Sequence, residues 1–236
     1  MGGASVRLEN VTVVYSQGTP NETVALDNVT LEIPAGETVL LMGGNGSGKS
    51  TLLKVIAGTI KPVSGKIFFD DVDVSGDSDI CRAKRVSFVH QDPLLGTCPS
   101  LTFFENTHIS SSDKWWWPFP YGLELQHEYV NMLHKMGIGH MDGRGSVPLN
   151  GFSGGQRQAV AISIALMKKP NLLLLDEMSS SLDLAVSEKL YFLLKENANI
   201  KEKTQIIVTH QREASEKIGD FIFSQDLGRI QVFKMS

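Results

Sequence analysis

The residues best suited to chemistry lie in a glycine-rich stretch that follows the apolar run 38–42. Their spacing is G-x-x-x-x-G-K-[ST], and the residues after it read as a helix that ends at Gly58. Glycines let a backbone approach an anion, and the start of a helix carries a partial positive charge. The lysine would contact the β- and γ-phosphates of a nucleotide, and the hydroxyl after it would bind Mg²⁺. A glycine turn that binds nothing is the alternative, but it needs the lysine and the hydroxyl to fall in register by chance. The predicted phosphate-binding residues are Gly43, Gly44, Asn45, Gly46, Ser47, Gly48, Lys49, Ser50 and Thr51, of which Lys49 also serves catalysis and Ser50 the metal.

Two carboxylates follow another apolar run, at 172–175. Mg²⁺ prefers hard oxygen ligands and keeps several waters, so Asp176 is expected to hold the metal directly or through water. Glu177 is then expected to orient and deprotonate the attacking water. A strand often ends in solvated acids, so the pair alone is weak evidence. Together with the glycine-rich stretch it indicates a nucleotide-hydrolysis site.

Four short aliphatic runs predict the sheet that must position these groups: 38–42, 86–89, 172–175 and 205–208. Runs of this kind suit parallel strands that are buried on both faces. In an open parallel sheet, ligands bind beyond the carboxyl ends of the strands, so the residues that follow should converge on one crevice. Those residues are Gly43, Gln91, Asp176, Glu177, Thr209 and His210.

The fold class predicted from this pattern is α/β. Further strands are expected at 6–15, 29–33 and 66–69, with a terminal hairpin at 221–224 and 229–233. Helices are expected at 124–136, at 153–169 and, after Asp183 as N-cap, at 184–198. We therefore predict one domain, with a nucleotide-binding core at 1–91 and 170–236 and an inserted helical subdomain at 92–169.

Composition limits the function classes. The 236 residues are 42% hydrophobic and 20% charged, which is typical of a soluble globular protein. The net charge of −4 argues against a protein that coats nucleic acid, since that needs a basic face. Cys81 and Cys98 are too few for a disulfide framework and are expected to be reduced thiols in the cytosol. The sequence also predicts no signal peptide and no membrane-spanning segment.

A second anion site is predicted at Ser153, Gly154, Gly155 and Gln156, where a serine and two glycines open a helix. A protein with one bound nucleotide has no obvious use for two such sites. Here the sequence resembles the ATP-binding cassette (ABC) ATPases, whose signature is Leu-Ser-Gly-Gly-Gln; this chain has Phe152 in place of the leucine. In that family, the signature of one subunit closes over the γ-phosphate held by the other. The resemblance implies ATP and Mg²⁺ as cofactors and a second copy of the chain as partner.

The resemblance also implies the architecture and further site residues. The architecture is a P-loop NTPase (RecA-like) core with an N-terminal antiparallel β subdomain and an inserted α-helical subdomain. Tyr15 matches the aromatic residue that stacks on adenine, although a half-buried strand tyrosine is about equally common. Gln91 matches the glutamine that senses Mg²⁺ and the γ-phosphate, and Asp183 lies in the loop that crosses the dimer interface. His210 matches the switch histidine; a lone histidine is more often structural, but its place after a strand favours the functional role.

The function implied by the resemblance is an ATP-hydrolysing subunit of a membrane transporter, located in the cytoplasm and peripheral on the inner face of the cell membrane. It would drive separate permease subunits. Segments such as Gly18-Thr19-Pro20-Asn21-Glu22, Arg82-Ala83-Lys84 and Gln91-Asp92-Pro93 are similar to a group of bacterial uptake ATPases that also use a substrate-binding protein.

Two other function classes remain. A soluble ABC ATPase of translation or DNA repair is disfavoured by the single cassette, the lack of a long heptad insertion and the lack of a basic stretch, so nucleic acid is not an expected partner. A regulatory module that does not hydrolyse ATP is disfavoured by the intact Lys49, Asp176, Glu177 and His210.

Three consecutive tryptophans, Trp115 to Trp117, form an unusual aromatic segment. Three neighbours on one helix or strand cannot all point inward, so some indole surface is expected to be exposed or to meet a partner. One hypothesis places this segment near the surface that receives a cytoplasmic helix of the permease. The alternative is an aromatic loop that folds on its own subdomain.

Overall fold

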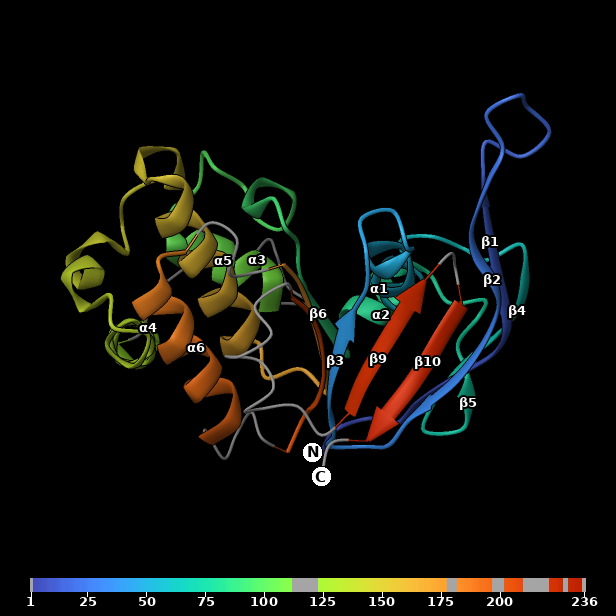
Figure 1. Cartoon of the computed structure of the whole chain (residues 1–236). Helices are drawn as coiled ribbons and strands as arrows, with labels where there is room; N and C mark the ends of the chain where they lie inside the picture. Colours follow the sequence, from blue (N-terminus) through green and yellow to red (C-terminus); the bar gives the residue numbers. More distant parts are fainter. Residues whose placement is uncertain are drawn as a thin grey trace. The chain divides into compact units, whose positions relative to one another are not determined.

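The computed structural model describes residues 2–111, 123–177, 182–196, 202–209, 221–226 and 229–234. The chain divides into two compact units, one of 1–88, 170–177 and 201–236, the other of 89–169 and 178–200. Both sheets lie in the first unit, apart from the end of one edge strand, and the longer helices other than α1 (Lys49–Ala57) lie in the second (Figure 1). The sequence-based domain boundaries stay a prediction; the compact units differ from them mainly in grouping 178–200 with the helical part.

An antiparallel sheet forms the N-terminal part of the first unit, in the order β2-β1-β4-β5. Alternate residues of β1 are buried, as expected for a strand with one face on a core, and they are Val6, Leu8, Val11 and Val13. The strand that we predicted to begin at 29 begins earlier, because pairing with β1 continues past Asn28 as far as Thr23. The strands are β1 (Val6–Tyr15), β2 (Thr23–Ile33), β4 (Ser64–Phe69) and β5 (Val72–Asp73).

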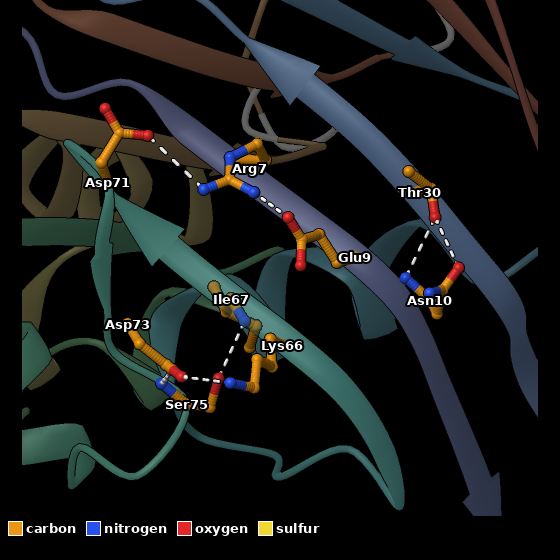
Figure 2. A network of polar contacts seen from close by, with 9 residues as sticks. All are labelled: Arg7, Glu9, Asn10, Thr30, Lys66, Ile67, Asp71, Asp73 and Ser75. Carbon is orange, nitrogen blue, oxygen red and sulfur yellow. Dashed lines mark hydrogen bonds and ion pairs between the residues drawn. The ribbon is translucent and has the colours of Figure 1, made fainter.

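Polar contacts tie β4 to the segment after β5 (Figure 2). Ser75 Oγ accepts a hydrogen bond from Ile67 N at 2.8 Å, and Ser75 N donates to Asp73 Oδ1 at 3.0 Å. The hydrogen bonds from Ser75 lower the pKa of the Asp73 carboxyl, and Lys66 lies 3.4 Å from the same carboxylate. These contacts fix the backbone at Val74, whose N–H also bonds to Ile67 O.

A six-stranded sheet forms the core of the first unit, in the order β10-β9-β3-β8-β7-β6. The predicted parallel arrangement is confirmed for β3 with β8 and for β8 with β7. The terminal hairpin is also confirmed, and its first strand pairs in parallel with β3, so it extends the core sheet (Figure 1). The strands are β3 (Thr38–Met42), β6 (Val86–Val89), β7 (Leu172–Asp176), β8 (Thr204–Val208), β9 (Phe221–Asp226) and β10 (Arg229–Lys234).

One hydrophobic cluster joins both sheets to α1. Leu52, Leu53 and Ile56 of this helix are fully buried, and they share the cluster with side chains of β1, β3, β7 and β8. The helix that follows the glycine-rich stretch is therefore anchored along its length to the strand that precedes the stretch and to the strand that carries Asp176.

The second unit holds the helices α3 (Phe103–Ser111), α4 (Leu123–Lys135), α5 (Gly154–Met167) and α6 (Leu184–Glu196). The last three agree with prediction to within two residues at each end. The sequence did not predict α3, since its run of Asn, Thr, His and Ser has weak helix propensity; burial of Phe103 against Tyr129, with ring centroids 4.0 Å apart, supplies the missing stability. Among the described residues, no helix is long and apolar enough to cross a membrane.

A buried arginine closes the far end of α1. Arg82, on the short helix α2 (Asp79–Ala83), is 3% exposed. Its guanidinium donates to Val55 O at 2.6 Å, to Ile56 O at 3.0 Å and to Val74 O at 2.6 Å. Gly58 ends the helix with φ 81°, and a Cβ there would lie 2.8 Å from the Arg82 side chain. Arg82 thus satisfies carbonyl groups at the negative end of the helix and joins them to the antiparallel sheet.

Replacing Arg82 by Met should lower the free energy of unfolding by about 2–4 kcal/mol, because three carbonyl oxygens would lose a buried donor. Urea denaturation measures this change. The matched control is Arg85→Met, which removes a partly exposed ion pair with Asp70 and should cost less than about 1 kcal/mol. Equal losses in the two variants would contradict the structural role given to Arg82.

Candidate functional site

The glycine-rich stretch adopts a conformation that ordinary residues disfavour. Gly46 has φ 77° and Gly48 has φ 102°, both in the left-handed region that favours glycine. Gly48 is the N-cap of α1, with no side-chain hydrogen bond, and the first turn of the helix has no acidic residue. The N–H groups and the positive end of α1 are therefore left for an anion from outside the stretch.

Lys49 folds back over the stretch. Its Nζ donates to Gly43 O at 2.9 Å and to Gly44 O at 2.8 Å, and the residue is 5% exposed. Within the described part of the chain, the buried Ser47 Oγ has no hydrogen-bond partner. A positive charge and an orphaned hydroxyl thus lie beside the N-terminus of α1, which is the donor set that a phosphate group requires.

Ser50, in the first turn of α1, meets Asp176 at the carboxyl end of β7. Ser50 Oγ donates to Asp176 Oδ1 at 3.1 Å, and Asp176, the last residue of β7, is 5% exposed. Burial raises the pKa of the Asp176 carboxyl above its ordinary value, the Ser50 hydrogen bond opposes the rise, and the neighbouring Glu177 charge adds to it. A cation held between the hydroxyl and the carboxylate would offset this cost.

Glu177 has a strained backbone. Its φ is 47°, which is unusual for a residue other than glycine, and its N–H donates to Val208 O at 3.0 Å. Strain of this kind persists only where the surrounding structure holds it, and it is common at functional sites. Backbone pairing of β7 with β8 and of β8 with β3 places Glu177 just beyond the carboxyl ends of these strands, at the level where the glycine-rich stretch follows β3.

The residues present fit ATP and Mg²⁺. The described residues contain no group of three or more His, Cys, Asp and Glu side chains that could hold a metal by themselves. Mg²⁺ in nucleotide sites is commonly held by one or two protein oxygens together with phosphate oxygens and water. One hydroxyl and one carboxylate, beside an uncapped helix and a lysine, meet that requirement.

Tyr15 lies at the end of β1, with 39% of its surface exposed. Its hydroxyl is 3.1 Å from Thr51 Oγ1, within hydrogen-bond distance, so the tyrosine side chain is tied to the first turn of α1. An exposed ring fixed in this way is available for stacking, but its contact with adenine stays a prediction.

The predicted second anion site opens α5 in the helical unit. Ser153 Oγ accepts from Gln156 N at 3.3 Å, and Gln156 Oε1 accepts from Ser153 N at 3.1 Å, so the two residues form a capping box. A Cβ at Gly154 would meet nothing within 4 Å, so the backbone there is open to an approaching group.

The remaining predicted residues belong to the same unit or fall outside the description. Asp183 caps α6 as predicted, with Oδ1 accepting from Val186 N at 2.9 Å. Gln91 is exposed. His210 and the Trp115–Trp117 segment lie outside the residues that the structure describes, and their roles stay predictions.

Two residues of the helical unit were missed by sequence reasoning. Gln158 is fully buried, and its Nε2 donates to His90 O at 3.3 Å, next to Gln91. Arg144 contacts Gly151, Phe152 and Gln156 in and beside the signature. Gln158 stands two positions after the signature and could have been found by that proximity, whereas Arg144 stands nine positions before Ser153 with no local pattern to mark it.

Known proteins resemble this chain over most of its length. The ABC transporter family model matches residues 26–180. The energy-coupling factor transporter ATP-binding protein EcfA2 of Clostridium acetobutylicum is 35% identical over 92% of this chain and 75% of its own length. The tyrosine transport ATP-binding protein of Clostridioides difficile is 33% identical over 90% of this chain and 84% of its own length. A dimeric, post-hydrolysis structure of the ATP-binding cassette MJ0796 bound to ADP and Pi matches with TM-score 0.84 and 31% identity, covering 98% of this chain and 99% of that one.

These matches confirm the predicted fold class, a P-loop ATPase cassette with mixed α/β architecture, and the resemblance to ABC ATPases. They also confirm ATP hydrolysis in the service of transport over the soluble alternative. The chain belongs to the ABC transporter family, as an ATP-binding and ATP-hydrolysing subunit.

Proposed function

We propose that this chain hydrolyses ATP with Mg²⁺ at a site of which it supplies one half. The observation that carries the proposal is the hydrogen bond from the half-buried Ser50 Oγ to Oδ1 of the buried Asp176, beside the uncapped N-terminus of α1. That arrangement combines donors for phosphate oxygens with two hard oxygens for a divalent cation.

Each residue has a distinct task in this half. Lys49 leaves its carbonyl partners for the β- and γ-phosphates, and the loop N–H groups bind the remaining oxygens. Ser50 and Asp176 would hold Mg²⁺, with Gln91 as the residue that senses it, and the ion would supply positive charge to neutralise the phosphates. Glu177 accepts the proton of the attacking water, and His210 contacts the γ-phosphate. Tyr15 stacks on adenine.

The other half of the site comes from a second copy of the chain. Ser153, Gly154, Gly155 and Gln156 at the start of α5 bind the γ-phosphate held by the partner, and Asp183 lies in the interface loop. The dimeric state of the MJ0796 cassette supports this arrangement. ATP binding then drives pairing of two chains, and hydrolysis separates them.

The work of this cycle is uptake through separate permease subunits, with a substrate-binding protein delivering cargo. Relatives named for methionine import and for sulfate/thiosulfate import support the inward direction. The chain would then be peripheral on the inner face of the cell membrane. Co-purification of the permease with this chain would test the partnership, and a permease that never co-purifies with it would contradict the proposal.

Lys49→Ala should weaken ATP binding to the single chain by about 100-fold or more, since a charge-assisted contact to phosphate is lost in a buried setting. Equilibrium binding of a fluorescent ATP analogue at low protein concentration measures this loss. The matched control, Lys61→Ala, removes an exposed lysine outside the stretch and should bind as the parent does. Unchanged binding by Lys49→Ala would contradict the phosphate site.

Glu177→Gln should retain ATP binding, pair in the presence of ATP and lower turnover by about 10²–10⁴-fold, the range for loss of a general base. Steady-state phosphate release measures turnover, and size-exclusion chromatography measures pairing. The control Glu188→Gln changes an exposed residue of α6 and should turn over normally. Normal turnover by Glu177→Gln would remove Glu177 from the role of base.

A further inference from the structure

Arg144, at the end of the 3₁₀ helix η2 (Gly139–Arg144), makes three contacts with the signature region. Its Nη1 donates to Gln156 Oε1 at 3.2 Å, and its Nη2 donates to Gly151 O at 2.9 Å. The guanidinium carbon lies 4.0 Å from the centroid of the Phe152 ring, which is within cation–π range. One side chain therefore contacts residues on both sides of Ser153.

The contact with Gln156 acts on the capping box. Gln156 Oε1 accepts from Ser153 N as well as from Arg144 Nη1, so both lone pairs of this carbonyl have donors. An amide oxygen with two directed donors keeps one side-chain orientation, and the box then holds Ser153 in one orientation too. Arg144 thus restrains the first turn of α5 through Gln156.

The departure from the family signature has a physical reason in the same contact. Phe152 is 3% exposed and replaces the usual leucine, and only an aromatic ring offers a face to the Arg144 cation. Arg157 Nη1 donates to Phe152 O at 2.7 Å, which fixes the backbone of the same residue. The signature loop is consequently held at its side chain and at its carbonyl by two arginines.

The element that carries Arg144 is itself anchored in the core of the helical unit. Tyr129, fully buried, donates its hydroxyl to Met141 O of η2 at 3.2 Å. The residue after Arg144 is Gly145, where a Cβ would lie 2.6 Å from the Phe104 ring and 3.1 Å from the Tyr129 ring. The close aromatic packing gives the arginine a fixed base from which to reach the signature.

Charge adds to this geometry. The first turn of α5 contains no acidic residue, so no acid within that turn neutralises the positive end of the helix. The Arg144 guanidinium places a full positive charge beside the same turn. Both effects favour an anion at the signature. Neither effect involves the glycine-rich stretch of the same chain.

From these contacts we propose that Arg144 is a positioning residue for the signature motif: it holds Gln156 and Phe152 so that the start of α5 is preorganised for the nucleotide bound by a second chain. The proposal rests on the two-chain site described above. Its distinctive consequence is that losing Arg144 weakens ATP-induced pairing and leaves ATP binding by the single chain unchanged.

The test uses the full-length chain with Glu177→Gln, so that the ATP-bound pair accumulates. Arg144→Met should raise the dissociation constant of the pair about ten-fold or more, as expected for loss of a hydrogen bond to a charged donor, while affinity of the single chain for an ATP analogue stays within about two-fold. Arg144→Lys keeps the cation but reaches fewer acceptors, and should fall in between. The control Lys135→Met removes an exposed cation of the same unit and should pair as the parent does.

A double-mutant cycle separates positioning from a general loss of stability. In a Gln156→Met background, Arg144→Met should weaken pairing much less than it does with Gln156 present, because its route to Ser153 is already removed. Phe152→Leu, which restores the family residue, should weaken pairing modestly by removing the cation–π contact. Melting temperatures identify any variant that has lost its fold, and the milder Arg144→Lys then carries the comparison.

The outcomes are distinct. Pairing of Arg144→Met equal to that of the parent, or the same loss with and without Gln156, overturns the role of Arg144 alone. Failure of the Glu177→Gln parent itself to pair with ATP overturns the two-chain site, and the role of Arg144 falls with it.

Discussion

The hydrogen bond between Ser50 and the buried Asp176 is the interaction on which the proposed nucleotide half-site depends. It joins the first turn of α1 to the end of β7, and the hydrophobic cluster beneath fixes both elements. Burial raises the pKa of the carboxyl, so the ionised carboxylate carries a desolvation cost that a bound divalent cation would offset. At the C-terminal end of α1, Arg82 donates to two of the last carbonyl groups and so stabilises the negative end of the helix dipole. The N-terminal, positive end of the same helix faces the phosphate-binding stretch.

The start of α5, in the other unit, resembles the start of α1 in having no acidic residue in its first turn. Its acid-free first turn and the adjacent Arg144 favour an anion there, yet the chain holds its phosphate-binding loop in the first unit. Under the proposed two-chain arrangement, each of these positions would supply part of one nucleotide site, and two molecules would share two nucleotides. ATP would then bridge the two chains, and its hydrolysis would release them from each other.

Much of this could be predicted from sequence because the motif residues are local. The glycine-rich stretch, the acidic pair and the cap of α5 are each set by a few neighbours, and the amphipathic patterns of α4 and α6 mark their own boundaries. The helix α3 depends instead on Phe103 packing against Tyr129, which is distant in sequence. Arg82 and Arg144 likewise gain their roles from carbonyls and rings that only the folded chain brings near them. Long-range contacts of this kind leave no periodic signal.

The central claim is that each site is composed of the loop of one chain and the signature of another. Mixing two inactive variants tests it most directly: Lys49→Ala lacks a working loop, and Ser153→Arg lacks a working signature. A mixed pair contains one complete site, formed by the loop of the Ser153→Arg chain and the signature of the Lys49→Ala chain. We expect ATP turnover to appear on mixing, well above the sum of the separate variants. Turnover equal to that sum at every mixing ratio would contradict the composite site.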